Sequence, residues 1–262
     1  MSITDVFVQE SGGFVISIFK TPITTIHRRT LMRWKMHLLR ASATLFGGIS
    51  IFYSVTQIPV ADSVAITFLA PIFGTLMSVL VLKESLSAAI VFKLIFGFSG
   101  VLVITGFSAD GNLSGYLAAL FGAFMTGVAY VSVKSLSDTE KPQDILYVSY
   151  LIMLPIAAGL AMYQWKTPTM LELGWLVAIG LAFYLSQILM AKAFSLAPAS
   201  KLLPVDYSRI IFSSLLGLVF LNQSFSLSAY IGAFIILLTS LIRDKDIEKI
   251  SRIGFFQRSS AR

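Results

Sequence analysis

The chain has 262 residues, of which 56% are hydrophobic and 13% are charged; its net charge is +7 and it contains no cysteine. A soluble domain carries about 25% charged residues because its surface must stay polar, so this composition excludes a soluble protein and indicates that lipid is the solvent. The missing cysteines exclude disulfides and thiol chemistry. A histidine-rich metal centre is excluded too, because only His27 and His37 are present.

The first 36 residues are predicted to be a basic cytoplasmic segment. They include Asp5 and Glu10 and lack the basic start and cleavage site of a secretion signal. The apolar run 13–19 is a helix remnant at most, since it ends at Lys20 and Pro22. A hydrocarbon layer of about 30 Å needs about 20 apolar residues to cross it.

Eight longer apolar runs follow, and each is predicted to be a membrane-spanning helix, because lipid offers the backbone no other hydrogen-bond partner. In chain order they are 38–57, 60–82, 88–107, 113–133, 145–163, 174–194, 200–221 and 226–242. The connections between them are short and polar. The predicted fold class is therefore an all-α polytopic membrane protein, a bundle of about eight transmembrane helices.

Lysine and arginine predict the orientation, because they concentrate in cytoplasmic loops and at cytoplasmic span ends. With both termini cytoplasmic, 17 of the 20 cations lie inside, Arg33 and Arg40 among them, Lys166 lies outside, and Lys93 and Arg209 lie within spans. The expected location is thus the inner cell membrane. The positive charge needs no nucleic acid to explain it. The basic tail 243–262 either lies on anionic lipid or is solvated.

Two parts of the chain overlay when the sequence is shifted by 139 residues. The shift places Ile58-Pro59-Val60 on Ala197-Pro198-Ala199, and the segment 82–87 on 221–226. Five predicted spans separate the equivalent helices, so the second copy is inverted in the membrane. Inverted repeats are a recurrent architecture of secondary transporters.

The segments 39–54, 58–62 (Ile-Pro-Val-Ala-Asp), 68–73 (Phe-Leu-Ala-Pro-Ile-Phe) and 82–87 (Leu-Lys-Glu-Ser-Leu-Ser) resemble the EamA domain of the drug/metabolite transporter superfamily. The part from 204 to 223 resembles the matching region of a second such domain. The resemblance covers about residues 37–242. It implies two inverted repeats and transport of a small organic metabolite, and we expect no cofactor.

The family usually has ten spans, so eight spans imply that the first helix and most of the second are absent. We therefore divide the chain into the basic segment 1–36, a partial first repeat 37–107, a second repeat 113–242 and the basic tail 243–262. Two functions stay open. The chain is either a secondary transporter or a truncated, transport-inactive membrane protein of the same family.

Asp206 and Arg209 are charged residues within a predicted span, where such groups are costly and usually functional. At about 100° per residue, they share one helical stripe with Ser213, which should face the bundle interior. The resemblance implies that this helix lines the substrate cavity. We expect the pair, together with the adjacent Tyr207, either to bind a polar or zwitterionic solute or to form an internal ion pair. Asp206 is the best candidate carrier if transport is coupled to protons.

Tyr184 and Gln187 are three residues apart on another predicted span, and suit either solute recognition or hydrogen bonds between helices. Asp62 and Glu84 lie at span ends, where helix-end or loop contacts are expected. Glycines within the spans are expected to allow close helix packing; they are Gly47, Gly48, Gly74, Gly97, Gly100, Gly122 and Gly127.

The sequence has no paired histidines, no catalytic serine with an intramembrane histidine, and no phosphate-binding glycine loop followed by lysine. We therefore predict a protein that is not an enzyme and is not driven by ATP on its own. An intramembrane enzyme stays an alternative that these absences oppose. The expected partners are the lipid bilayer and a small-molecule solute, with no nucleic acid. A homodimer is left open.

Overall fold

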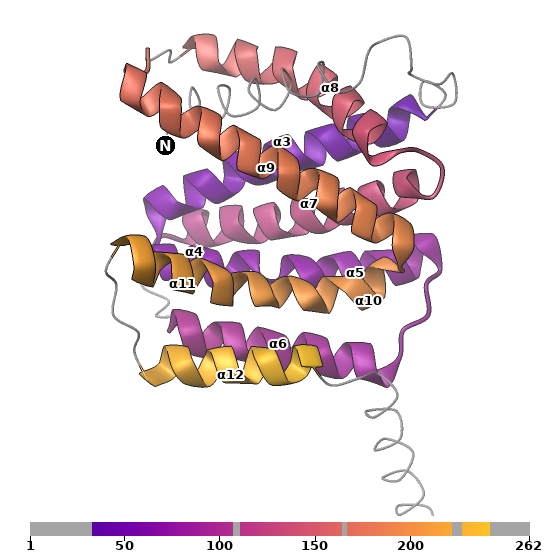
Figure 1. Ribbon diagram of the computed structural model, residues 1–262, viewed down its shortest axis with the longest axis vertical. Helices are drawn as coiled ribbons and strands as arrows, with labels where there is room; N and C mark the ends of the chain where they lie inside the picture. The colour runs from indigo at the N-terminus through magenta and orange to yellow at the C-terminus, as the bar shows by residue number, and fades with distance from the viewer. Residues whose placement is uncertain (1–32, 107–110, 164–166, 222–226, 242–262) are drawn as a thin grey trace, which may run out of the picture.

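The structure is a computed structural model, and it describes residues 33–106, 111–163, 167–221 and 227–241. In these residues the chain forms one bundle of helices that run roughly alongside one another (Figure 1). In chain order the elements are α3 (Trp34–Gln57), α4 (Val60–Thr67), α5 (Ala70–Leu82), α6 (Ala88–Thr105), α7 (Leu113–Ser137), α8 (Pro142–Tyr163), α9 (Met170–Leu196), α10 (Ala199–Leu202), the 3₁₀ helix η2 (Leu203–Tyr207), α11 (Ser208–Leu221) and α12 (Leu227–Leu241).

Every one of the eight predicted spans is helical in the described part of the chain, which confirms the all-α membrane fold. Among the described residues, five stretches are long and apolar enough to cross a membrane: Trp34–Gln57, Val60–Leu82, Ala88–Thr105, Leu113–Ser137 and Met170–Leu196. Two of the eight predicted spans are broken. The run 60–82 divides into α4 and α5 at Phe68, and the run predicted as 200–221 divides into α10, η2 and α11.

The predicted inverted repeat is visible in the helix boundaries. The shift of 139 residues carries Gln57, Val60, Leu82 and Ala88, which are helix ends in the first half, onto Leu196, Ala199, Leu221 and Leu227, which are helix ends in the second. Hence α3 corresponds to α9, the broken helix α4–α5 corresponds to α10–η2–α11, and α6 corresponds to α12. Both broken helices therefore occupy the same place in their repeats.

Glycines set the closest helix contacts in the bundle, because a small residue lets two backbones approach. The equivalent helices α6 and α12 lie side by side (Figure 1), and a Cβ on Gly232 would lie 2.5 Å from the carbonyl oxygen of Gly100. Similarly, α3 and α7 meet where a Cβ on Gly122 would lie 3.1 Å from the carbonyl oxygen of Gly47. This is the packing role predicted for these glycines. Gly48 differs, since a Cβ there would meet nothing within 4 Å.

The span-end carboxylates make the contacts predicted for them. Glu84, in the α5–α6 connection, accepts the backbone N–H groups of Ala199 at 2.9 Å and Ser200 at 2.8 Å, and so joins the first half to the start of α10. Partial burial raises the pKa of Glu84, but these hydrogen bonds outweigh it and bring the pKa below its ordinary value of 4.5. Asp62 is fully buried and accepts the hydroxyl of Tyr116 at 2.7 Å.

His37 lies inside the bundle near the start of α3 and is fully buried. Its Nε2 lies 3.0 Å from Oε2 of Glu140, which belongs to the α7–α8 connection. Four residues earlier, Arg33 donates to the carbonyl and hydroxyl oxygens of Ser135 and to the hydroxyl of Thr139. These contacts fix the start of α3 against the end of α7.

Candidate functional site

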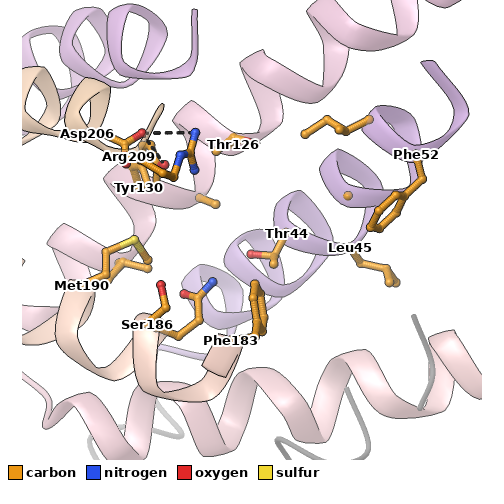
Figure 2. Close-up of a pocket in the computed structure, with 15 residues that line it drawn as sticks. Thr44, Leu45, Phe52, Thr126, Tyr130, Phe183, Ser186, Met190, Asp206 and Arg209 are labelled. Atoms are coloured by element: carbon orange, nitrogen blue, oxygen red, sulfur yellow. Dashed lines mark hydrogen bonds and ion pairs between the residues drawn. The ribbon is translucent and has the colours of Figure 1, made fainter. Parts of the chain in front are cut away.

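A cavity of about 440 Å³ lies among α3, α7, α9 and the η2–α11 junction. Most of its wall is apolar, and polar side chains gather in two places (Figure 2). The lining residues are Thr44, Leu45, Gly48, Ile51, Phe52, Thr126, Ala129, Tyr130, Val133, Phe183, Ser186, Gln187, Met190, Asp206 and Arg209. They lie well away from most helix ends, so the cavity is near the middle of the bundle.

The first polar place is a charged pair on the broken helix of the second half. Arg209 Nη2 lies 3.5 Å from Asp206 Oδ2, and the hydroxyl of Tyr130 donates to the same carboxylate oxygen at 3.2 Å. Figure 2 shows these three side chains together, away from Phe183 across the cavity. The Arg209 guanidinium also lies 4.8 Å from the ring centre of Phe68, within cation–π range.

The local backbone explains why these charges point inward. Pro204 lies in the first turn of η2, where its missing N–H is tolerated, and the tighter 3₁₀ geometry continues to Tyr207. Asp206 therefore lies at the end of η2, and Arg209 lies in the first turn of α11. A break in a membrane helix is tolerated where it borders a cavity, as this one does.

The second polar place is formed by Thr44 of α3 with Ser186 and Gln187 of α9. Behind it lies Arg40, whose side chain is inside the bundle and only 3% exposed. Arg40 Nη2 donates to Gln187 Oε1 at 3.3 Å, and Nη1 donates to the carbonyl oxygen of Ile145 and to the hydroxyl of Ser149. The cavity wall thus carries one polar patch with both signs of charge and a second patch of uncharged hydrogen-bonding groups, and the wall between them is apolar.

Three of the six residues predicted to bind a solute line this cavity: Asp206, Arg209 and Gln187. The other three lie elsewhere. Tyr207 is fully buried against α6, where a Cβ on Gly97 would lie 2.3 Å from its ring. Ser213 is exposed, donates to the carbonyl oxygen of Ile210 and does not line the cavity. Tyr184 is buried and stacks on Tyr150 of α8.

Most of the lining residues were not predicted, although the repeat contains a signal for them. The shift of 139 residues places Thr44, Gly48 and Ile51 of α3 on Phe183, Gln187 and Met190 of α9, and all six line the cavity. The prediction of Gln187 on α9 therefore pointed to Gly48 on α3. Gly48 was instead grouped with the packing glycines.

An open groove of about 600 Å³ runs beside the cavity, between α9 and α10–α11. Tyr130, Ser186, Met190, Asp206 and Arg209 line both spaces, so the charged pair is reached from either one. The rest of the groove is mostly apolar. In the first half the equivalent place, between α3 and α5, is filled by α7, where a Cβ on Gly127 would lie 2.9 Å from the backbone of Gly74. Among the described residues, no helix fills the place in the second half.

The side chains that line the cavity are of the kind that bind a small solute. They offer a carboxylate, a guanidinium, hydroxyls and a carboxamide, all on helices. In the described part of the chain, no group of three or more histidine, aspartate or glutamate side chains could hold a metal ion.

An apolar helical bundle built as an inverted repeat around a central cavity, with a charged pair beside a broken helix, is a recurrent architecture of membrane transporters. The EamA-like transporter family matches residues 3–106 and 113–242, and the chain belongs to this family. Its members are transporters rather than enzymes. The first match includes residues 3–32, which lie outside the described residues, so the absence of early helices stays a prediction.

Relatives carry more specific names. The chain is 25% identical over 231 residues to an S-adenosylmethionine uptake transporter of Rickettsia bellii, covering 87% of this chain and 79% of the relative. It is 27% identical over 212 residues to a riboflavin transporter of Brucella anthropi, covering 79% of this chain and 75% of the relative. A solved crystal structure of a protein superposes with a TM-score of 0.75 at 20% identity, covering 91% of this chain and 87% of the other. That superposition supports the fold alone.

Proposed function

We propose that the chain is a secondary transporter that moves a small polar or zwitterionic metabolite across the inner cell membrane. The observation that carries this proposal is the Asp206–Arg209 pair on the cavity wall. Charged groups within a membrane protein are costly unless they are paired or functional. Here both signs of charge face a space large enough for a solute.

The geometry of the pair favours solute binding over a purely structural role. Its 3.5 Å separation exceeds the about 2.7–2.9 Å of a strong charge-assisted hydrogen bond. The Arg209 side chain is 49% exposed and that of Asp206 is 24% exposed, so each retains free hydrogen-bonding capacity. A solute carboxylate suits Arg209, and a solute ammonium suits Asp206.

The size and walls of the cavity narrow the class of solute. Its volume of about 440 Å³ lies in the range of about 300–1,000 Å³ typical of small-molecule sites. S-adenosylmethionine and riboflavin, for which two relatives are named, each join a flat ring system to a polar chain. We infer a solute of this kind, with its apolar body between the cavity walls and its charged end at Asp206 and Arg209.

The distribution of lysine and arginine supports an orientation with both termini cytoplasmic. Asp206 is the best candidate proton carrier, because it borders the cavity at mid-bundle depth. Lipid and solute are the partners that this proposal needs, and neither nucleic acid nor a second copy of the chain enters it.

The test uses Gly48, which lines the cavity and has open space where its side chain would be. Gly48→Leu should fill the cavity without disturbing the packing of α3. Gly159→Leu is the matched control, because Gly159 of α8 also has nothing within 4 Å and does not line the cavity. Both variants and the parent are reconstituted into liposomes and offered a panel that includes S-adenosylmethionine, riboflavin and free amino acids.

We expect saturable uptake by the parent and by Gly159→Leu, and at least a tenfold loss in Gly48→Leu at equal reconstitution. Uptake that survives in Gly48→Leu would place the solute path elsewhere. If the parent inserts but moves none of the panel, the alternative of a transport-inactive protein is favoured. No structural observation favours that alternative.

A further inference from the structure

The contact between Arg40 and Gln187 determines which atoms of Gln187 are presented to the cavity. Arg40 is a buried cation on α3, and its Nη2 donates to Oε1 of Gln187 on α9 at 3.3 Å. A guanidinium has five N–H donors and no acceptor. Only the oxygen end of the carboxamide can therefore face Arg40.

The remaining end of the carboxamide is left for a ligand. Within the described residues Nε2 of Gln187 donates to no protein atom, and the side chain is half-buried in the cavity wall. Thr44, beside it, uses its own hydroxyl proton on the carbonyl oxygen of Arg40. The two N–H groups of Gln187 are therefore fixed donors at this end of the cavity.

Arg40 has the contacts needed to hold this arrangement. Its other terminal nitrogen donates to the carbonyl oxygen of Ile145 and to the hydroxyl of Ser149, both on α8. Arg40 does not line the cavity, and the small space that it lines together with Gln187 is about 10 Å³, room for about one water molecule and too small for a solute group. Arg40 therefore acts through Gln187 and does not itself reach the solute.

We propose that Arg40 is a positioning residue that makes Gln187 a donor-only contact, so that the cavity selects solutes carrying a neutral hydrogen-bond acceptor, such as an unprotonated ring nitrogen or a carbonyl oxygen. This inference rests on the proposed function, because it names a specificity of the same cavity. It adds an uncharged contact, distinct from the charged pair, on the helix that corresponds to α3. A solute without an acceptor leaves the two N–H groups unpaired, and a buried unpaired donor is costly.

Two probes differing at one ring atom test the proposal: the pyridylethyl and phenylethyl thioethers of L-cysteine. Both carry the zwitterionic end that suits Asp206 and Arg209, and only the pyridyl ring carries an acceptor. Binding to the purified full chain in detergent is measured by saturation-transfer NMR and competition. Mildly alkaline buffer keeps the pyridine nitrogen neutral.

The protein should bind the pyridyl probe about tenfold more tightly than the phenyl probe, the ratio expected for one hydrogen bond to a fixed donor. Gln187→Glu removes the donors and places a carboxylate against Arg40, so the ratio should fall to about one. Arg40→Met frees the carboxamide to turn and should also lower the ratio. Arg40→Lys keeps a donor-only cation and should retain most of it. Lys134→Met is the control, because Lys134 donates to the carbonyl oxygen of Phe194 at a helix end and does not line the cavity.

A parent protein with no preference for the pyridyl probe would overturn the proposal, as would a ratio unchanged in Gln187→Glu and Arg40→Met. If Arg40→Met does not fold, Gln187→Glu and Arg40→Lys still decide the outcome. Binding of neither probe would overturn the assigned class of solute. It would leave the proposed function standing if Gly48→Leu abolishes uptake in liposomes, so the two failures are distinguishable.

Discussion

The pair Asp206 and Arg209 allows a structural role to be separated from a functional one by a double-mutant cycle. In Arg209→Gln, the Asp206 carboxylate keeps only the hydroxyl of Tyr130 at 3.2 Å, and the guanidinium loses its place over Phe68. An uncompensated charge at mid-bilayer costs about 2.5–3.5 kcal/mol on insertion scales, and a cation–π contact contributes about 0.5–2 kcal/mol. Because Arg209 is half-exposed to the cavity, we expect about 2–3 kcal/mol of destabilisation. Asp206→Asn should cost a similar amount.

The double variant removes both charges and should recover most of that stability, because neither charge is left alone. Stability is measured as the free energy of unfolding in mixed micelles, and function as uptake into liposomes at equal reconstitution. If the pair only holds the helix, the double variant should recover folding and uptake together. If it binds the solute, the double variant should recover folding and stay inactive, which is the outcome we expect. A double variant with full uptake would refute the binding role.

Three further predictions concern residues outside the cavity. Glu84→Gln should destabilise the protein by about 1–2 kcal/mol at neutral pH. Because hydrogen bonding lowers the pKa of Glu84, the stability that its carboxylate contributes is present above about pH 4.5 and is lost as the pH falls through the folded-state pKa. The acid unfolding curves of the parent and the variant should therefore converge. Gly232→Ala should lower the free energy of unfolding in micelles by about 1–3 kcal/mol, because the new Cβ would meet the backbone of α6 at 2.5 Å. Gly159→Ala is the control and should be neutral or stabilising. Equal effects of the two variants would contradict the close packing. Pro168→Cys should react with a membrane-impermeant thiol reagent in intact cells, since the chain has no other cysteine; labelling only after membrane disruption would reverse the orientation.

The helices could be predicted closely because lipid requires every membrane-spanning segment to be an apolar helix. The apolar runs predicted the eight helical stretches to within a few residues, and the repeat relates helix ends such as Gln57 and Leu196. The breaks at Phe68 and in η2 were not predicted. Both broken helices are apolar over most of their length, and hydropathy does not respond to a short change in backbone geometry.

The cavity was harder to predict, because its shape depends on which faces of different helices meet. Arg40 was predicted to be one of the cations on the cytoplasmic side. It lies in the second turn of α3, inside the bundle, where its side chain is only 3% exposed. Tyr207 was predicted to bind because it is adjacent to Asp206. Its ring instead fills the space that Gly97 leaves on α6, a pairing between distant segments that no local pattern shows. Asp206 and Arg209, by contrast, were singled out as charges within a span, and both line the cavity.

The two halves supply the cavity with equivalent positions and unequal chemistry. The walls from α3 and α9 are related by the repeat, but Asp206 and Arg209 correspond to Thr67 and Ala70, which carry no charge. The charged pair that we propose binds the solute therefore belongs to the broken helix of the second half, α10–η2–α11. Two of the contacts between the halves, Glu84 with the start of α10 and Arg40 with Gln187, lie toward the end of the bundle where α3 begins. A conformation that opens the cavity at that end by separating the halves must give up both, and losing the second would release the carboxamide that we propose selects the solute.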